Sequence, residues 1–290
     1  MVRTSSAEVA FPFSIEEVGM DSVLSPIPVV VSGATGRMGR EIVRTILGQV
    51  GMELVGAIGH ARHLGEDIGE LVIGEPCGVI VTPDIDQALS AARGGVLVEV
   101  STGSFIKEVV FKAAQYNVAC VIGSTGISNV DSEAIANLAK ESSHPILFAP
   151  NFAMGAVLMM KFAKMASKYF HWAEIIEMHH ERKLDAPSGT AMYTAEAMAR
   201  ASGGKFRAPV EGEESVKGVR GGKYGGIRIH SVRMPGFLAD QEVLFGSQGE
   251  TLTIHHSAST RECFMSGVVI AIQKVRSLDG MVVGLENIID

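Results

Sequence analysis

The stretch that decides the fold is IPVVVSGATGRMGREIVRTILGQV, residues 27–50. It opens with a short continuous apolar run, which is typical of a strand buried on both faces of a sheet. A glycine-rich turn follows from Gly33 to Gly39, and the apolar residues between Ile42 and Leu47 then recur at helical spacing. The order of strand, glycine turn and helix predicts the first unit of an open α/β sheet.

The same alternation continues through the first half of the chain. Apolar runs that predict further strands occupy residues 52–59, 78–81, 96–100, 119–122 and 146–149. Helical patterns separate the later runs, at residues 106–116 and 131–141. Strands that alternate with helices predict a Rossmann-type, doubly wound parallel sheet.

The pattern changes after Pro150. Helices are expected at residues 154–169 and 188–201, and a glycine-rich loop at residues 203–226. Strands are expected from Glu174 onward and at residues 227–232, 241–247 and 251–256. Successive strands without intervening helices predict an α+β domain with an open mixed sheet.

An apolar helix is expected at residues 263–278, and it would return to pack on the first domain. The chain therefore divides into an N-terminal extension, a dinucleotide-binding domain and a substrate domain. The expected boundaries are residues 1–26 for the extension, 27–151 with 263–290 for the dinucleotide-binding domain, and 152–262 for the substrate domain.

Composition excludes several classes of protein. A hydrophobic content of 47% is ample for a buried core, and a net charge of -7 argues against a nucleic-acid binder. The three cysteines, Cys77, Cys120 and Cys263, are too sparse for a disulfide framework and indicate a reducing compartment. No run is long enough to cross a membrane, and the acidic N-terminal segment fits poorly with a transit peptide. The predicted compartment is the cytoplasm, with a plastid-like stroma as the alternative.

The glycine turn predicts a dinucleotide site, because free N–H groups at a helix N-terminus favour a pyrophosphate. An NAD-preferring site usually has an acid after the second strand, where this chain has Gly59 followed by His60. Basic side chains there and at Arg37 favour NADPH, with NADH as the alternative. Two later strand ends carry small polar groups, although ordinary loops would look similar. The predicted cofactor residues are Gly33, Ala34, Thr35, Gly36, Arg37, Met38, His60, Gly123, Ser124, Thr125, Ala149, Pro150, Asn151 and Phe152.

A second polar stretch, EIIEMHHERKLDAPSGTA at residues 174–191, gathers ionisable groups where a strand leads into a helix. Ser188 is a candidate N-cap, and the amides of Gly189 and Thr190 would then face outward as an anion receptor. Two imidazoles, an ammonium and a helix N-terminus fit a small dianionic substrate that also needs proton transfer. The candidate residues are His179, His180, Lys183, Ser188, Gly189 and Thr190, with Arg261 beside a second histidine pair as a further carboxylate clamp.

No metal is expected in this stretch. Adjacent histidines in a strand point to opposite faces, so His179 and His180 cannot easily share one ion. Lys183 would repel a cation, and no HExxH spacing occurs. The remaining alternative is a capped helix preceded by solvated surface charges.

The segments GATGRMGREI, VIGSTGI, FAPNFAMGA and EIIEMHHERKLDAPSGTA resemble the 4-hydroxy-tetrahydrodipicolinate reductase (dihydrodipicolinate reductase) family of the diaminopimelate route to lysine. The resemblance implies an enzyme that uses NAD(P)H to reduce 4-hydroxy-tetrahydrodipicolinate to tetrahydrodipicolinate with loss of water. It also implies a homotetramer that assembles through the substrate domain.

The resemblance assigns roles by position. His179 matches the family's proton donor/acceptor, Lys183 its proton donor, and His180 with the Gly189–Thr190 pair its substrate contacts. The dinucleotide segments match at residues 33–38, 123–125 and 149–152. The chain departs from the pattern after the second strand, where Gly59 replaces an acid and His60 an arginine, so the cofactor preference stays open.

Two rival functions remain at this stage. An NADP-linked semialdehyde dehydrogenase would need a nucleophilic cysteine in the substrate domain, whereas Cys77 and Cys120 lie in the cofactor half and Cys263 at the start of the last helix. A non-catalytic NADPH-binding regulator would tolerate the loss of His179 and Lys183.

Overall fold

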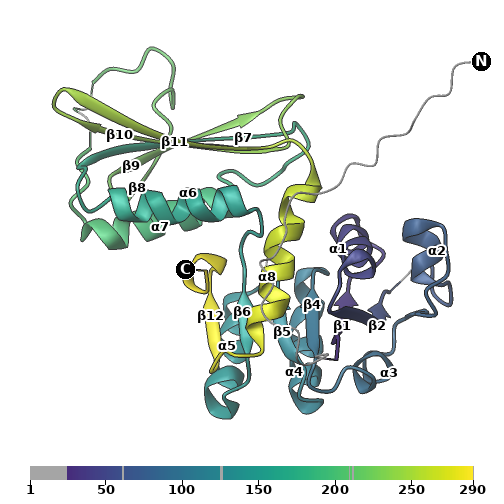
Figure 1. Ribbon diagram of the computed structural model, residues 1–290. Helices are drawn as coiled ribbons and strands as arrows, with labels where there is room; N and C mark the ends of the chain where they lie inside the picture. Colours follow the sequence, from purple (N-terminus) through teal and green to yellow (C-terminus); the bar gives the residue numbers. More distant parts are fainter. Residues whose placement is uncertain (1–24, 61, 125–126, 209, 211, 290) are drawn as a thin grey trace, which may run out of the picture.

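The computed structural model describes residues 25–60, 62–124, 127–208, 210 and 212–289. Thr125, one of the predicted cofactor residues, lies outside the described residues, as does nearly all of the predicted N-terminal extension. The described chain builds two sheets, each with its own helices (Figure 1).

The first sheet has seven strands in the order β12-β6-β5-β4-β1-β2-β3, and all its pairs are parallel. This confirms the predicted doubly wound sheet. The strands are β1 (Ile27–Ser32), β2 (Met52–Ile58), β3 (Val81–Thr82), β4 (Val96–Glu99), β5 (Ala119–Ile122), β6 (Ile146–Phe148) and β12 (Met281–Val283). The helices are α1 (Arg37–Gly48), α2 (Ile68–Ile73), α3 (Ile85–Ser90), α4 (Gly103–Gln115), α5 (Asn129–Ser142) and α8 (Met265–Val275).

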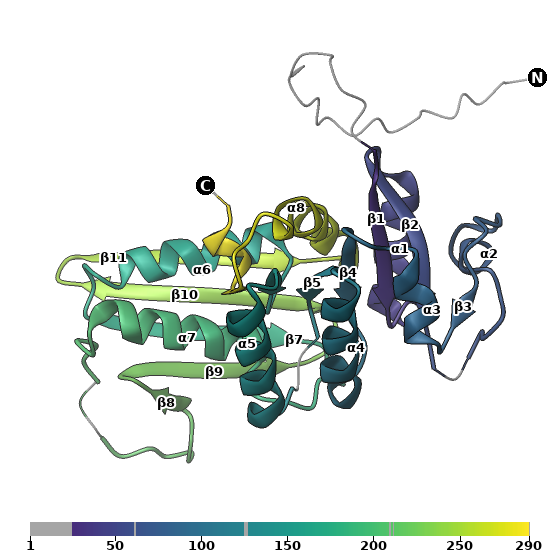
Figure 2. The same ribbon diagram turned by 90° about the horizontal axis from the view of Figure 1, so that it is seen from below.

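Helices cover both faces of this sheet because alternate strand residues point to opposite sides. Val30, Leu97 and Ile122 pack with α3, α4 and α5 on one face. Val31 and Val98 pack with α1 and α8 on the other. Figure 2 shows α4 and α5 side by side, away from α8. The burial of both faces explains why these strands read as continuous apolar runs.

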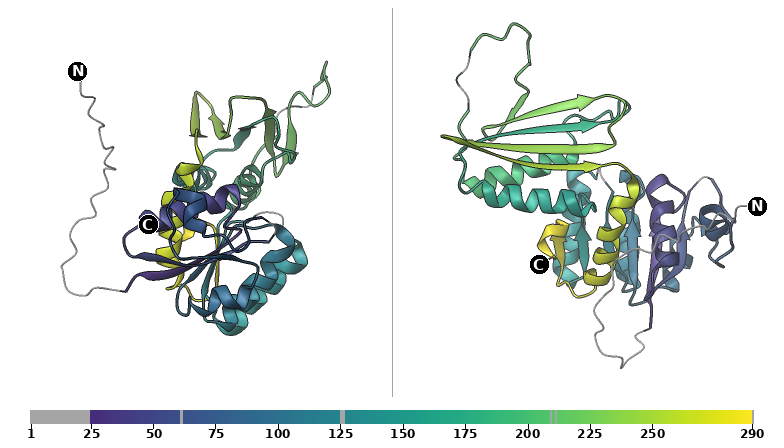
Figure 3. Two further views of the ribbon diagram at one scale, coloured as in Figure 1. Left: turned by 90° about the vertical axis from the view of Figure 1, so that its right-hand side faces the viewer. Right: turned by 45° about the horizontal axis from the view of Figure 1, so that its top comes forward.

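The second sheet is mixed and has the order β11-β10-β7-β9-β8, in which β7 and β9 are parallel and the other pairs antiparallel. Its strands are β7 (Trp172–His179), β8 (Gly222–Tyr224), β9 (Ile227–Arg233), β10 (Ala239–Ser247) and β11 (Glu250–Ala258). Helices α6 (Met154–Ala166) and α7 (Gly189–Ser202) cover one face (Figure 1). Within the described chain the opposite face carries no helix (Figure 3).

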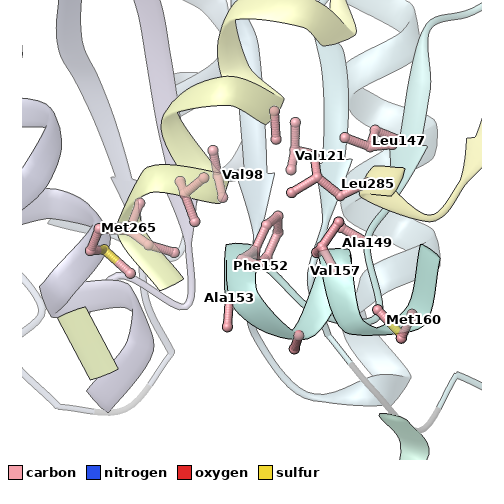
Figure 4. Close-up of a cluster of buried hydrophobic side chains, with 14 of the residues drawn as sticks. Val98, Val121, Leu147, Ala149, Phe152, Ala153, Val157, Met160, Met265 and Leu285 are labelled. Carbon is pink, nitrogen blue, oxygen red and sulfur yellow. The ribbon is translucent and has the colours of Figure 1, made fainter. Parts of the chain in front are cut away.

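The core continues from the first sheet into α6. Phe152 is 3% exposed, and Figure 4 shows its ring between the ends of the first-sheet strands and the first turn of α6. A Cβ at Gly123 would overlap that ring, and one at Gly267 would overlap the Phe152 carbonyl. The short helix η2 (Leu285–Asn287) closes the same cluster through Leu285. The two halves therefore share one packed junction.

Three predictions of local structure were wrong, and other elements were not predicted. The strand expected at residues 78–81 reaches the sheet only at Val81, because Asp67 accepts hydrogen bonds from the Cys77 and Gly78 amides and holds them in a loop. Residues 203–226, expected as a loop, contain the edge strand β8. The last helix begins as a 3-10 turn, η1 (Arg261–Phe264), and ends at Val275. Helices α2 and α3 and strand β12 were not expected. Among the described residues, no helix is long and apolar enough to span a membrane.

Candidate active site

A buried carboxylate organises the end of β7. Glu177 is fully buried, and its Oε2 lies 2.5 Å from Nδ1 of His179. Arg233, which pairs in register with His179 on the neighbouring strand β9, donates to both oxygens of Glu177, at 3.0 and 2.7 Å. Arg233 also donates to the Asp185 carbonyl at 2.7 Å. The strand end, its neighbour and the following loop are thus joined through one ion-pair network.

This network fixes the state of Glu177 and the orientation of His179. Burial alone would raise the pKa of Glu177, but hydrogen bonds from His179 and Arg233 outweigh it and lower the pKa to about 2. The ionised carboxylate occupies Nδ1 of His179, which leaves Nε2 for another partner. Neither Glu177 nor Arg233 was predicted from the sequence. Glu177 could have been recognised from the alternation of apolar residues in β7, which places it on the buried face with Ile175.

Lys183 lies in the loop after β7 and is part-buried. Its Nζ forms an ion pair with Asp185 Oδ1 at 2.8 Å, and its amide donates to the His180 carbonyl at 3.1 Å. Burial would raise the pKa of Asp185, but the bond from Lys183 outweighs it and lowers the pKa. Because Asp185 is 60% exposed, another carboxylate could replace it beside the ammonium group.

The start of α7 has the predicted serine cap. Ser188 caps the helix, since its side chain accepts from the Ala191 amide at 3.2 Å. Gly189 and Thr190 are the first two helical residues, and their amides have no carbonyl partner within the helix. Asn151, in the segment between the two sheets, donates from Nδ2 to Thr190 Oγ1 at 3.2 Å. This bond joins the helix start to the predicted cofactor segment.

A small cavity brings part of the predicted site together. Its volume is about 20 Å³, and it lies between the first turns of α6 and α7 and the second sheet. It is lined by Asn151, Ala156, Met159, His179, Ser188, Thr190, Ala239, Asp240, Gln241, His256, Ala258 and Phe264. His180, Lys183, Gly189 and Arg261 are not in this lining, although the first three belong to the same loop and helix start. Gln241 and His256 are wall residues that the sequence reasoning did not assign.

The glycine turn has the close contacts that a dinucleotide site requires. Gly33 has a φ of 78°, and a Cβ on it would lie 2.9 Å from the Ser101 amide at the end of β4. A Cβ at Gly39 would overlap the Gly33 carbonyl. Gly36 is the N-cap of α1 and has no side chain that could bond the first amides of the helix. Ser124 donates to the Ser101 carbonyl at 2.9 Å and so ties the predicted segment after β5 to the same place.

Basic side chains gather beside this turn. Arg37, Arg40, Arg44 and Arg261 line a second cavity of about 500 Å³, together with Glu41, Leu71, Leu238, Ser259, Thr260 and Glu262. Thr35 positions Arg40, which donates to its carbonyl at 3.0 Å. Arg261, predicted as a substrate clamp, therefore lies with Arg37 and not with His179.

Two other predicted cofactor residues, His60 and Phe152, lie away from the glycine turn's close contacts. His60 is exposed at the end of β2, with its ring edge-on to Phe105 at 3.9 Å between centroids. The side chain of Phe152 belongs to the core, so only its backbone is available to a ligand. In the described ranges no three His, Cys, Asp or Glu residues form a group that could hold a metal.

The cysteines lack the properties of a nucleophile. Cys120 is completely buried, and burial raises the pKa of its thiol. Burial also raises the pKa of Cys263, the one nearest the substrate domain. A thiolate is the reactive form, so this environment disfavours the semialdehyde dehydrogenase hypothesis.

Comparison with known proteins assigns the family. The family described as dihydrodipicolinate reductase, N-terminus, matches residues 27–152, and the one described as dihydrodipicolinate reductase, C-terminus, matches residues 155–289. The chain belongs to the dihydrodipicolinate reductase family.

Individual members of the family are similar over nearly the whole chain. The 4-hydroxy-tetrahydrodipicolinate reductase of Desulfitobacterium hafniense is 44% identical over 268 residues, which cover 92% of this chain and 100% of that protein. The enzyme of the same name from Bacillus pumilus is 46% identical over 264 residues, covering 91% and 98%. The solved structure of dipicolinate-bound dihydrodipicolinate reductase from Paenisporosarcina sp. TG-14 has a TM-score of 0.79 at 38% identity, and covers 91% of this chain and 100% of that one.

Proposed function

We propose that this chain catalyses the NAD(P)H-dependent reduction of 4-hydroxy-tetrahydrodipicolinate to tetrahydrodipicolinate, with loss of water, in lysine biosynthesis via diaminopimelate. Membership of the dihydrodipicolinate reductase family supports the reaction. The structural observation that carries it is the junction of β7 and α7, where residues 179–190 supply an oriented imidazole, an ammonium group and a capped helix N-terminus. These groups suit a small dicarboxylate that exchanges protons.

We propose that the substrate's carboxylates bind at this junction. One carboxylate replaces Asp185 beside Lys183, whose ammonium already holds a carboxylate there at 2.8 Å. The other accepts from the amides of Gly189 and Thr190, capped by Ser188, where the helix dipole favours an anion. His180 is proposed to contact the same ligand, because it occupies the position of a substrate contact in the family motif, and its carbonyl accepts from the Lys183 amide.

His179 is proposed to carry the proton and Lys183 to act as a second donor. Nδ1 of His179 bonds to the ionised Glu177, so Nε2 exchanges a proton with the ring and the carboxylate stabilises the imidazolium that forms. Glu177 and Arg233 act as positioning residues. Bound NAD(P)H supplies the hydride.

The proposed cofactor site is built on the glycine turn and the later strand ends. Its residues are Gly33, Ala34, Thr35, Gly36, Arg37, Met38, His60, Gly123, Ser124, Thr125, Ala149, Pro150, Asn151 and Phe152. The clashes that a Cβ would make at Gly33 and Gly39 support a turn that a dinucleotide can approach. We propose NADPH as the preferred form, because arginines line the adjacent cavity and no acid follows β2 at Gly59. Arg261 would serve an anionic group of this cofactor, since it shares that cavity with Arg37.

We also propose a division of labour between the domains. Residues 27–151 with 263–290 would bind the dinucleotide, and residues 152–262 would bind the substrate and form a homotetramer. The helix-free face of the second sheet supports assembly, because Trp172 of β7 is 39% exposed and does not share a face with Ala173 and Ile175, which alternate toward the buried face. The free thiols of Cys77, Cys120 and Cys263 support the cytoplasm as the compartment.

The test of this function is a coupled assay. A dihydrodipicolinate synthase generates the unstable substrate in situ, and NADPH oxidation is followed by its absorbance. Steady oxidation that depends on both of the synthase's precursors and on this chain is expected. Absence of oxidation with either NADPH or NADH would overturn the proposal, and activity that survives the loss of both His179 and Lys183 would overturn the assigned roles.

A further inference from the structure

The cavity between α6, α7 and the second sheet has room for about one water molecule at its inner end. Its volume is about 20 Å³, and roughly 10–15 Å³ of such space holds one water molecule. Ser188 and Thr190 at the start of α7 belong to the cavity lining, so a ring whose carboxylate binds at that helix start places one small substituent in the cavity.

The cavity wall contains a buried polar group that the proposed site does not use. Gln241 is 4% exposed, and its Nε2 donates to Thr194 Oγ1 at 3.0 Å. Its Oε1 is buried and, within the described residues, has no hydrogen-bond partner. Leaving such an oxygen unpaired costs about 1–3 kcal/mol. Because Gln241 lines the cavity, a ligand group that donates to this buried acceptor would satisfy it.

His256 lies beside Gln241 in the same wall. The two residues are register partners on β11 and β10, so their side chains lie on the same face of the sheet. The imidazole is half-buried against the backbone of Gly155 at the start of α6. Burial lowers the pKa of His256. The charge of Asp240 opposes this shift and that of His255 adds to it, and the lowered pKa favours the neutral ring. A neutral imidazole has one N–H donor and one acceptor, so it can either donate to a hydroxyl group or accept from it.

The substrate of the proposed reaction carries a hydroxyl group at C4 of its ring. When this hydroxyl group is lost, the C4–O bond breaks, and the hydroxyl takes up one proton and leaves as water. The neighbouring ring carbon gives up one proton, and a C=C bond forms between the two carbons. The leaving group therefore needs hydrogen-bond partners and space for one water molecule. Building on the proposed function, we propose that Gln241 and His256 form a subsite for the substrate's 4-hydroxyl group and for the water that it becomes.

The subsite makes a prediction about ligand selectivity. A site built to hydrogen-bond a hydroxyl group discriminates against the analogue that lacks it, because its own polar groups are then left unpaired. The matched probes are piperidine-2,6-dicarboxylate and 4-hydroxypiperidine-2,6-dicarboxylate, which differ only in the hydroxyl group. Calorimetric titration of the full chain with each compound gives the ratio of the two dissociation constants. We expect the wild type to bind the hydroxylated compound about tenfold more tightly.

Two variants locate the effect and a third controls for structure. Gln241→Met and His256→Asn should bring the ratio close to 1 while the affinity for the compound without the hydroxyl changes by less than about threefold. Thr194→Val removes the partner of Gln241 Nε2 but leaves Oε1 in the wall, so it should keep the wild-type ratio. Thermal unfolding shows which variants are folded. One folded variant of the first two, Gln241→Met or His256→Asn, is enough to test the subsite.

The outcomes separate this inference from the proposed function. If both compounds bind the wild type equally, or if the folded variants keep the ratio, the subsite is refuted while dicarboxylate binding stands. If neither compound binds the wild type, the proposed function fails and the subsite with it.

Discussion

Replacing Glu177 by glutamine removes the charge at the centre of the buried network while keeping the size of the side chain. The carboxyl group is fully buried, and its pKa falls from 4.5 to about 2. That shift corresponds to roughly 3 kcal/mol of folding free energy, since one pKa unit is about 1.4 kcal/mol. The substitution also leaves Arg233, whose side chain is 18% exposed, without its anionic partner. We expect Glu177→Gln to lower the free energy of unfolding by about 3 kcal/mol at neutral pH.

The pH dependence of this loss has a definite sign. A carboxyl group with a depressed pKa stabilises the fold fully above its ordinary value of 4.5, and the stabilisation disappears as the pH falls toward 2. The difference between wild type and variant should therefore be constant above about pH 5 and shrink steadily below it. Urea denaturation followed by circular dichroism at a series of pH values measures it.

The control is Glu174→Gln on the same strand. Glu174 also pairs with a histidine, His230, at 2.8 Å, but it is 49% exposed, so the change should cost no more than about 1 kcal/mol. A loss of unfolding free energy for Glu177→Gln no larger than that of this control would contradict stabilisation by the ionised Glu177. So would a loss as large near pH 3 as at neutral pH.

Three further predictions test the site and the rival function. Lys183→Ala should lower kcat by roughly 10²–10⁴-fold while the dissociation constant for NADPH, measured by fluorescence, stays within about twofold; equal losses in both would contradict its role. Gly33→Ala should destabilise by about 1–3 kcal/mol and weaken NADPH binding, because its φ is 78° and its Cβ would meet Ser101. Gly48→Ala, with open space around its Cβ, should do neither. Cys263→Ser should retain full activity in the coupled assay. An inactive variant would instead support the semialdehyde dehydrogenase hypothesis, in which a cysteine is the nucleophile.

The sequence predicted those elements whose own pattern carries the signal. The buried strands of the first sheet are continuous apolar runs, and α1 has a regular apolar face, so both were recognised. Helices α2 and α3 have only six residues each, which is too short for a periodic pattern. Their aspartate N-caps, Asp67 and Asp84, were the signal that could have revealed them.

Other features depend on pairing between distant segments. Strand β12 joins the first sheet by pairing Met281 with Ile146 of β6, and three residues near the chain end carry no strand pattern of their own. Within the site, His179, Lys183 and the Ser188 cap could be inferred because they lie in one short stretch. Arg233 could not, because it reaches Glu177 only through the pairing of β7 with β9.

The central claim is that the end of β7 and the start of α7 bind a dicarboxylate ring next to the dinucleotide. The most direct measurement is a crystal structure of this chain with NADPH and pyridine-2,6-dicarboxylate. We expect one carboxylate on Lys183 in place of Asp185, the other on the amides of Gly189 and Thr190, and the ring beside His179. A ring bound elsewhere, with the Lys183–Asp185 ion pair intact, would contradict it.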